Sequence, residues 1–158
     1  MNRRSTAVAL TVAGLAVTAA PAAQASDAGL QKTVVRYEKR VAPLAKSFAQ
    51  ADKALDTATD TNTASAATGK FRDGLHAYKK AIVPIKTQSV TAAAGKKQIL
   101  TAIREFDLGL VQYQKLLDQV NAGADKTTLK ATFVTLNKRI KAAAADETAA
   151  LKKLGLVK

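Results

Sequence analysis

The sequence predicts an all-α protein, an up-down-up-down four-helix bundle behind a cleaved signal peptide. Three observations lead to this prediction. Large apolar residues recur at alternating spacings of four and three, short polar turns separate four such stretches, and an uncharged N-terminal run follows two arginines. The alternation places the apolar residues on one stripe of each helix. Each stripe needs partner helices to cover it, which favours a bundle.

Residues 1–25 have the three parts of a secretory signal peptide. Arg3 and Arg4 supply the positive region, residues 7–20 an uncharged run, and residues 23–25 the small-residue cleavage site Ala-Gln-Ala. The run is shorter than the roughly 20 residues that span a bilayer, which disfavours a retained membrane anchor. Bulky apolar residues do not follow the arginine pair, so Sec export is favoured over Tat. We therefore expect one exported domain, residues 26–158, that is extracellular or associated with the cell envelope.

The first two helices are expected to flank a polar connection at residues 59–65. Ser26 or Asp27 is a candidate N-cap for the first, whose stripe is Leu30, Val34, Tyr37, Val41, Leu44, Phe48, Ala51, Leu55 and Ala58. Pro43 lies on its outer face and should kink or split it. The second stripe is Phe71, Leu75, Tyr78, Ile82 and Ile85, with Pro84 near its end.

The last two helices follow a turn at residues 87–91, where Ser89 or Thr91 is a candidate cap. The stripe of the third is Ile99, Ile103, Phe106, Leu110, Tyr113, Leu117 and Val120. Gly123 is expected just beyond its C-terminus, and Asp125 before the fourth helix. The fourth stripe is Leu129, Phe133, Leu136, Ile140, Ala143, Glu147, Ala150 and Leu154.

Glu147 is the one ionisable residue on these stripes. A buried carboxylate must be paired, hydrogen-bonded or protonated. Counting helical rises back through the turns places Glu147 within about two turns of Tyr37. The sequence therefore suggests a buried polar pair of Tyr37 and Glu147. The alternative is that Glu147 reaches solvent at a frayed end.

The sequence offers little for catalysis or metal binding. A di-iron centre in a bundle needs Glu-x-x-His pairs on two helices, and the chain has one histidine, His76, expected on an outer face. There is no cysteine and no Gly-x-Ser-x-Gly turn. The paired acids at 105/107 and 146/147 point apart on a helix. We expect no enzyme activity, no catalytic residue, no metal site and no cofactor.

The formal net charge of the chain is +13. Of the properties of the whole sequence, this positive charge bears most directly on function. Lysines recur every seven residues opposite the first stripe, at Lys32, Lys39, Lys46 and Lys53. Further candidate polyanion-binding residues are Lys79, Lys80, Lys138, Arg139 and Lys141. The alternative is an ordinary solvated surface. A specific nucleic-acid ligand is disfavoured, since the aromatic residues needed to stack bases lie on the stripes.

Two classes of function remain open. The first is a secreted, non-enzymatic interaction module that binds an anionic envelope polymer or an acidic protein. The second is a carrier of an apolar or porphyrin-like ligand in a core loosened by Gly74, Gly109 and the prolines. The valines flanking the stripes leave room for a homo-oligomer. The abundant alanine and lysine and the few aromatics resemble secreted proteins of high-GC Gram-positive bacteria.

Overall fold

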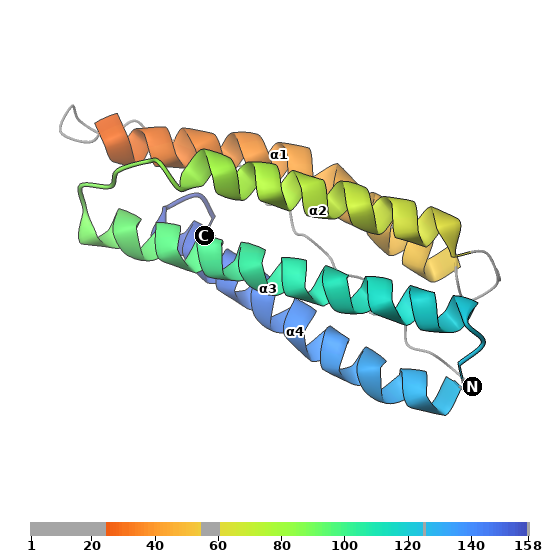
Figure 1. Cartoon of the computed structure of the whole chain (residues 1–158). Helices are drawn as coiled ribbons and strands as arrows, with labels where there is room; N and C mark the ends of the chain where they lie inside the picture. The colour runs from red at the N-terminus through yellow and green to blue at the C-terminus, as the bar shows by residue number, and fades with distance from the viewer. Residues whose placement is uncertain (1–24, 55–60, 125, 158) are drawn as a thin grey trace.

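The structure is a computed structural model that describes residues 25–54, 61–124 and 126–157. These residues form four helices, α1 (Ala25–Ala54), α2 (Asn62–Ile82), α3 (Val90–Asn121) and α4 (Lys126–Lys153) (Figure 1). The predicted all-α class and the four helices are confirmed. The predicted signal peptide, most of the first connection and the Asp125 cap lie outside the described residues.

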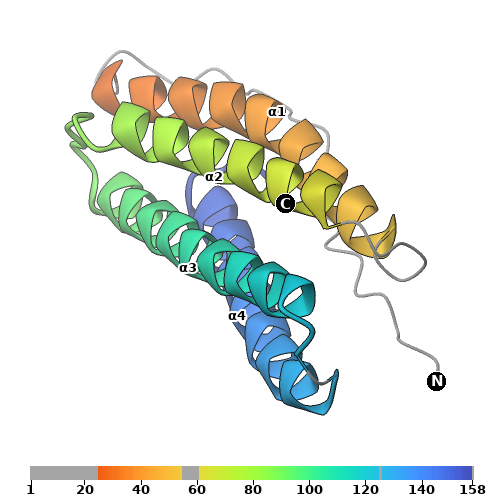
Figure 2. The same cartoon turned by 45° about the vertical axis from the view of Figure 1, so that its right-hand side comes forward.

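The helices form two layers, α1 with α2 and α3 with α4 (Figures 1 and 2). Helices that are consecutive in the chain are neighbours, and the layers meet mainly where α2 packs on α3. α1 and α4 make no close backbone approach over the described residues. Gln31 joins these two helices at one end by donating to the backbone carbonyl of Leu154 at 2.7 Å.

Glycine allows close packing within each layer. A Cβ atom on Gly74 of α2 would lie 2.6 Å from Cδ1 of Leu44, and one on Gly95 of α3 would lie 2.8 Å from Cδ2 of Leu154. Gly109 would bring a Cβ atom to 3.3 Å from Ile140. The approaches at Gly74 and Gly95 are closer than real Cβ atoms make, so a larger residue there would displace the leucine side chain, and the approach at Gly109 is tight. Gly74 and Gly109 therefore lie at close helix contacts, which gives no support to the loosened core assumed by the carrier hypothesis.

Four aromatic side chains from three helices occupy the middle of the core. The ring of Phe48 lies 5.9 Å from that of Phe71 and 4.9 Å from that of Tyr113, and Phe71 lies 6.2 Å from Phe106. All four side chains are buried. Full burial of such a side chain contributes about 1.5–3 kcal/mol, so this cluster holds the two layers together.

The helix boundaries differ from the prediction at three places. Residues 62–65 belong to α2 rather than to a connection, because Ala64 is buried and Ser65 donates to Gln114 of α3 at 3.0 Å. α1 continues through Pro43 without a break. α2 ends at Ile82. The N–H of Val83 still donates to the carbonyl of Lys79 at 3.0 Å, but Pro84 has no N–H group to continue the helical hydrogen bonds.

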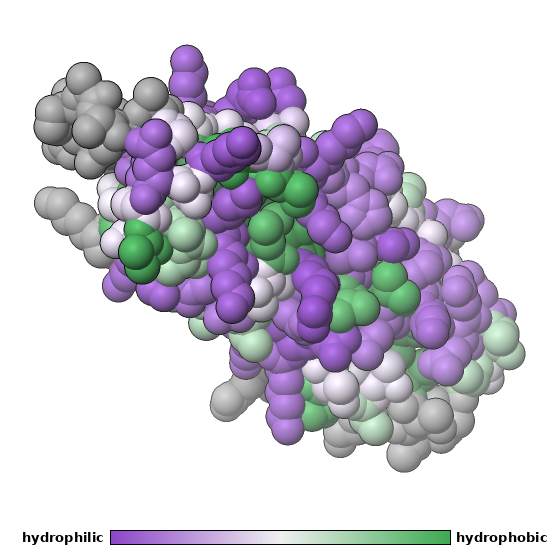
Figure 3. Space-filling view, turned by 60° about the vertical axis from the view of Figure 1, so that its left-hand side comes forward, coloured by the Kyte–Doolittle hydropathy of each residue, from purple (hydrophilic) through white to green (hydrophobic). Residues whose placement is uncertain are grey.

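The predicted limits of α3 are confirmed. Ser89 caps it by accepting a hydrogen bond from the backbone N–H of Ala92 at 3.1 Å. Gly123 follows its end with a φ of +76°, a conformation that favours glycine. Val120, expected on the stripe, is instead 41% exposed. Figure 3 shows one face on which hydrophilic residues surround separate apolar patches, and the exposed large apolar residues are Val83, Val90, Leu108, Val120 and Val134.

Candidate polyanion interface

The solvent-facing side of α1 carries only positive charge among its ionisable residues. Six cations are exposed along the helix, Lys32, Arg36, Lys39, Arg40, Lys46 and Lys53. The four lysines lie seven residues apart, which corresponds to about 10 Å along a helix. No acidic residue of α1 is exposed. We call these six residues the α1 cationic face.

The three acids of α1 accept hydrogen bonds from α2, from α3 and from the connection between them. Asp27 accepts hydrogen bonds from the backbone N–H groups of Gln88 and Ser89, at 2.9 and 3.1 Å. Glu38 accepts from the hydroxyl of Tyr78 at 2.8 Å, and Asp52 accepts from that of Tyr113 at 2.7 Å. Both tyrosine side chains are buried. Glu38 and Asp52 thus satisfy buried hydroxyls and Asp27 satisfies backbone N–H groups, and within the described part of the chain none of the six cations forms an ion pair with them.

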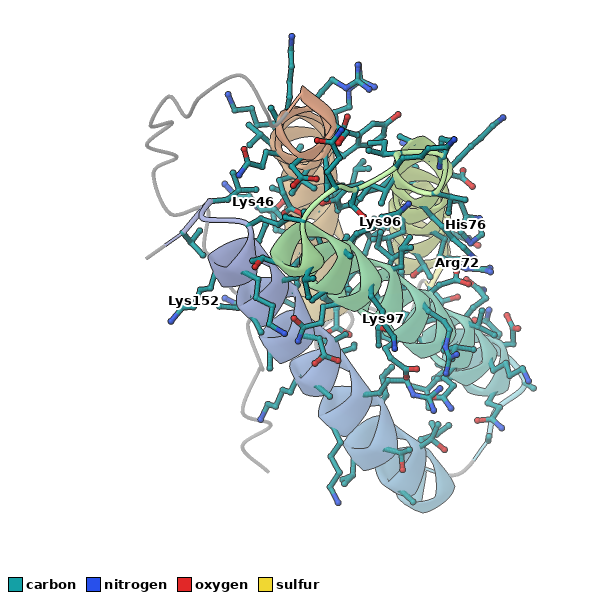
Figure 4. The ribbon with its side chains drawn as sticks, turned by 90° about the vertical axis from the view of Figure 1, so that its left-hand side faces the viewer. Lys46, Arg72, His76, Lys96, Lys97 and Lys152 are labelled. Carbon is teal, nitrogen blue, oxygen red and sulfur yellow. The ribbon has the colours of Figure 1, made fainter. Side chains whose placement is uncertain are left out.

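The other predicted binding residues lie on different parts of the surface. Lys79 and Lys80 are exposed in the last turn of α2, and Lys138 and Lys141 are exposed on α4. Arg139 is only partly exposed, and its Nε lies 3.4 Å from Oε2 of Glu105. Figure 4 places Lys46 and Lys152 on the opposite side of the molecule from Arg72 and His76. The predicted residues therefore do not converge on one site.

Two acidic residues of α3 form ion pairs with arginines that lie outside the α1 cationic face. Asp107 lies 2.8 Å from Nε of Arg72 and 3.1 Å from Nε2 of His76. Partial burial would raise the pKa of Asp107, but hydrogen bonds from Arg72 and His76 outweigh this effect and lower it. Glu105 lies within 3.4 Å of both Arg104 and Arg139. Among the side chains that the structure describes, no lysine forms an ion pair.

Glu147 is buried, as its position on the α4 stripe predicts, with 8% of its surface exposed. Burial raises its pKa to about 8, with a further contribution from the charge of Glu38. Burial also raises the pKa of Glu38, although the hydrogen bond from Tyr78 acts in the opposite direction. The two carboxyl groups come from α4 and α1, the helices whose backbones do not approach closely.

No hydrogen bond joins Tyr37 to Glu147 among the described side chains, so their pairing stays a prediction. The hydroxyl that contacts a carboxylate here belongs to Tyr78, and the carboxylate is Glu38. Tyr37 instead stacks on Tyr78, with ring centres 5.3 Å apart and planes inclined by 2°. The charge of Glu147 acts on Tyr78, and the charge of Glu38 acts on Glu147, so the buried acid of α4 lies near this tyrosine pair.

Sequence reasoning overlooked Arg36 and Arg40. Their guanidinium carbons lie 5.2 and 5.4 Å from the centre of the Tyr37 ring. The spacing offered a signal for Arg40 only, because residues three apart on a helix are neighbours whereas adjacent residues do not face each other. That both lack an acidic partner could not be read from the sequence, where Glu38 stands between them.

Among the residues that the structure describes, the core contains a small cavity. It has a volume of about 10 Å³ and is lined by Ala45, Phe48, Phe71, Phe106, Leu110 and Ile140. Ligand pockets usually enclose about 300–1,000 Å³, so this cavity is too small for a porphyrin. In the described part of the chain, no three His, Cys, Asp or Glu side chains are grouped to hold a metal ion. Nor does any helix within it have the length and apolar character needed to cross a membrane.

Comparisons with protein-family models, with curated proteins and with solved structures find no match for this chain. The candidate interface is accordingly defined by its own geometry, a cationic helix face whose neighbouring acids are turned inward.

Proposed function

We propose that the protein is a secreted, non-enzymatic interaction module that binds an anionic polymer of the cell envelope through the α1 cationic face. The observation that carries the proposal is that α1 exposes six cations and no acid. Uncompensated charges along one helix raise the local concentration of a polyanion and bind it with salt-dependent affinity. A long polymer can contact several of these charges at once, which adds avidity.

The proposal includes export and topology. We infer that residues 1–25 are removed as a signal peptide and that residues 26–158 form an up-down-up-down bundle. The short connections and the packing of consecutive helices support this arrangement. In it, α1 is an outer helix that presents one side to solvent along its whole length.

The test compares two variants of equal net charge. In the first, Lys32, Lys39, Lys46 and Lys53 are replaced by Glu. In the matched control, four exposed lysines elsewhere are replaced by Glu: Lys79, Lys80, Lys138 and Lys141. Co-sedimentation with bacterial envelopes is measured from about 0.05 to 0.5 M salt, over which the screening length falls severalfold.

We expect the first variant to lose affinity by about 100-fold or more at low salt and the control by about tenfold or less, because nearby charges dominate a screened interaction. Wild-type binding should vanish toward 0.5 M salt. Equal losses in both variants would refute the assignment to α1. Absence of wild-type binding at low salt would refute the function itself.

A further inference from the structure

Arg36 and Arg40 lie one helical turn apart and share one aromatic ring. Both guanidinium carbons are within 5.4 Å of the ring centre of Tyr37. Stacking on an aromatic ring leaves the N–H groups at the edge of a guanidinium available for hydrogen bonds. The pair therefore presents two sets of donors at one place on the α1 cationic face.

Neither guanidinium is ion-paired within the ranges 25–54, 61–124 and 126–157. Among the described residues, Arg36 and Arg40 form no ion pair and no hydrogen bond, and both are exposed. Glu38, two residues from each, is directed to the buried Tyr78 hydroxyl. Two like charges held close together repel each other, and this repulsion is relieved when an anion binds between them.

The ring beneath the arginines is itself held in place. Tyr37 stacks in parallel on Tyr78, whose side chain is 1% exposed and donates to Glu38. A fixed ring restricts the two long side chains before any ligand arrives. Restricting them in advance lowers the entropy lost on binding, which strengthens the interaction.

We propose that Arg36 and Arg40, supported by Tyr37, form a clamp for the phosphate groups of a phosphodiester polymer; this rests on the proposed function. The lone pairs of a carboxylate lie in one plane, so a bidentate contact with one guanidinium uses both of its oxygens. The two charged oxygens of a phosphodiester lie in different directions around a tetrahedral phosphorus, so each can accept from a different guanidinium group. Lys32 and Lys39 lie beside the clamp and attract neighbouring phosphates as point charges.

The test keeps the charge and removes the guanidinium groups. The double variant Arg36→Lys/Arg40→Lys is compared with Arg104→Lys/Arg139→Lys, whose arginines contact Glu105. Binding to poly(glycerol phosphate) and to poly-L-glutamate of matched length is measured by titration calorimetry at about 0.1 M salt. Thermal unfolding of each variant checks that the fold is retained.

We expect the clamp variant to bind poly(glycerol phosphate) about 5- to 20-fold more weakly, and the control to change by less than about twofold. The loss for poly-L-glutamate should stay below about threefold. Unchanged affinity of the clamp variant for poly(glycerol phosphate) would overturn the clamp and leave the proposed function standing. Equal losses for both polymers would overturn the phosphate assignment. If wild type binds neither polymer, the proposed function fails as well.

Discussion

On α1 the carboxylates of Glu38 and Asp52 accept hydrogen bonds from buried tyrosines, whereas on α3 the partly exposed carboxylates of Glu105 and Asp107 lie beside arginines. The same residue types therefore have opposite effects on the two helices. Inward acids satisfy hydroxyl groups and leave the surface positive, while outward acids neutralise the surface locally. The difference shows that a cationic face depends as much on where the acids point as on where the lysines stand.

The largest expected effect comes from the inward acid on α4. In the unfolded chain Glu147 should titrate near 4.5, and in the folded protein its pKa is about 8. Between these values unfolding releases a proton, so the stabilisation from this group is complete below pH 4.5 and is lost as the pH rises to 8. Glu147→Gln removes this dependence and should raise the free energy of unfolding at pH 9 by about 3–5 kcal/mol over wild type.

Urea unfolding between pH 4 and 9 measures this difference. Asp146→Asn is the matched control, because Asp146 is the neighbouring acid and is not buried. Its pH profile should follow that of wild type. Parallel profiles for wild type and Glu147→Gln would show that the carboxyl group reaches water in the folded protein. The contrast between inward and outward acids would then not extend to α4.

A smaller effect on the free energy of unfolding is expected from removing the tyrosine hydroxyl that donates a hydrogen bond to Glu38. Tyr78→Phe removes the hydrogen bond to Glu38 and should lower the free energy of unfolding at pH 8 by about 1–3 kcal/mol, since a buried acceptor loses its donor. The loss should shrink near pH 4, because a protonated Glu38 is bound less strongly than a charged one. Chemical denaturation at pH 8 and at pH 4 measures the loss of unfolding free energy at each pH.

Tyr37→Phe is the control for this prediction. It keeps the ring that stacks on Tyr78, and among described residues the Tyr37 hydroxyl has no hydrogen-bond partner. Its free energy of unfolding should stay within about 0.5 kcal/mol of wild type. A loss as large as that of Tyr78→Phe would support the pairing of Tyr37 with Glu147 that the sequence suggests.

Most of the helical framework could be predicted from the sequence, because apolar spacing determines which side of a helix is buried. Ile99, Phe106 and Leu117 are buried as their stripe predicts. The start of α2 could not be predicted, since Asn, Thr and Ser have low helix propensity. Tertiary contacts override that propensity there, among them the hydrogen bond from Thr61 to Asn121 of α3 at 2.8 Å.

The candidate site was predictable only in part. The seven-residue lysine repeat on α1 locates the cationic face, because helical periodicity alone places it opposite the apolar stripe. The Arg36 and Arg40 pair depends on Glu38 turning toward Tyr78 on another helix. Which residues meet across two helices depends on their axial register and rotation. A single sequence does not determine the axial register or the rotation of two packed helices to within one residue.

The smallest expected effect on stability comes from removing an acid of α3 that lies beside arginines. Asp107→Asn removes the ion pairs to Arg72 and His76 at the surface and should lower the free energy of unfolding by less than about 1 kcal/mol. It also leaves Arg72 uncompensated on the side opposite Lys46 (Figure 4). If the polymer binds on α1, its affinity should rise by no more than about twofold, since the new charge is distant and screened. Calorimetric titration with poly(glycerol phosphate) measures this change. An increase of fivefold or more would place binding near Arg72, so that local compensation on α3 rather than the α1 cationic face would control the interaction.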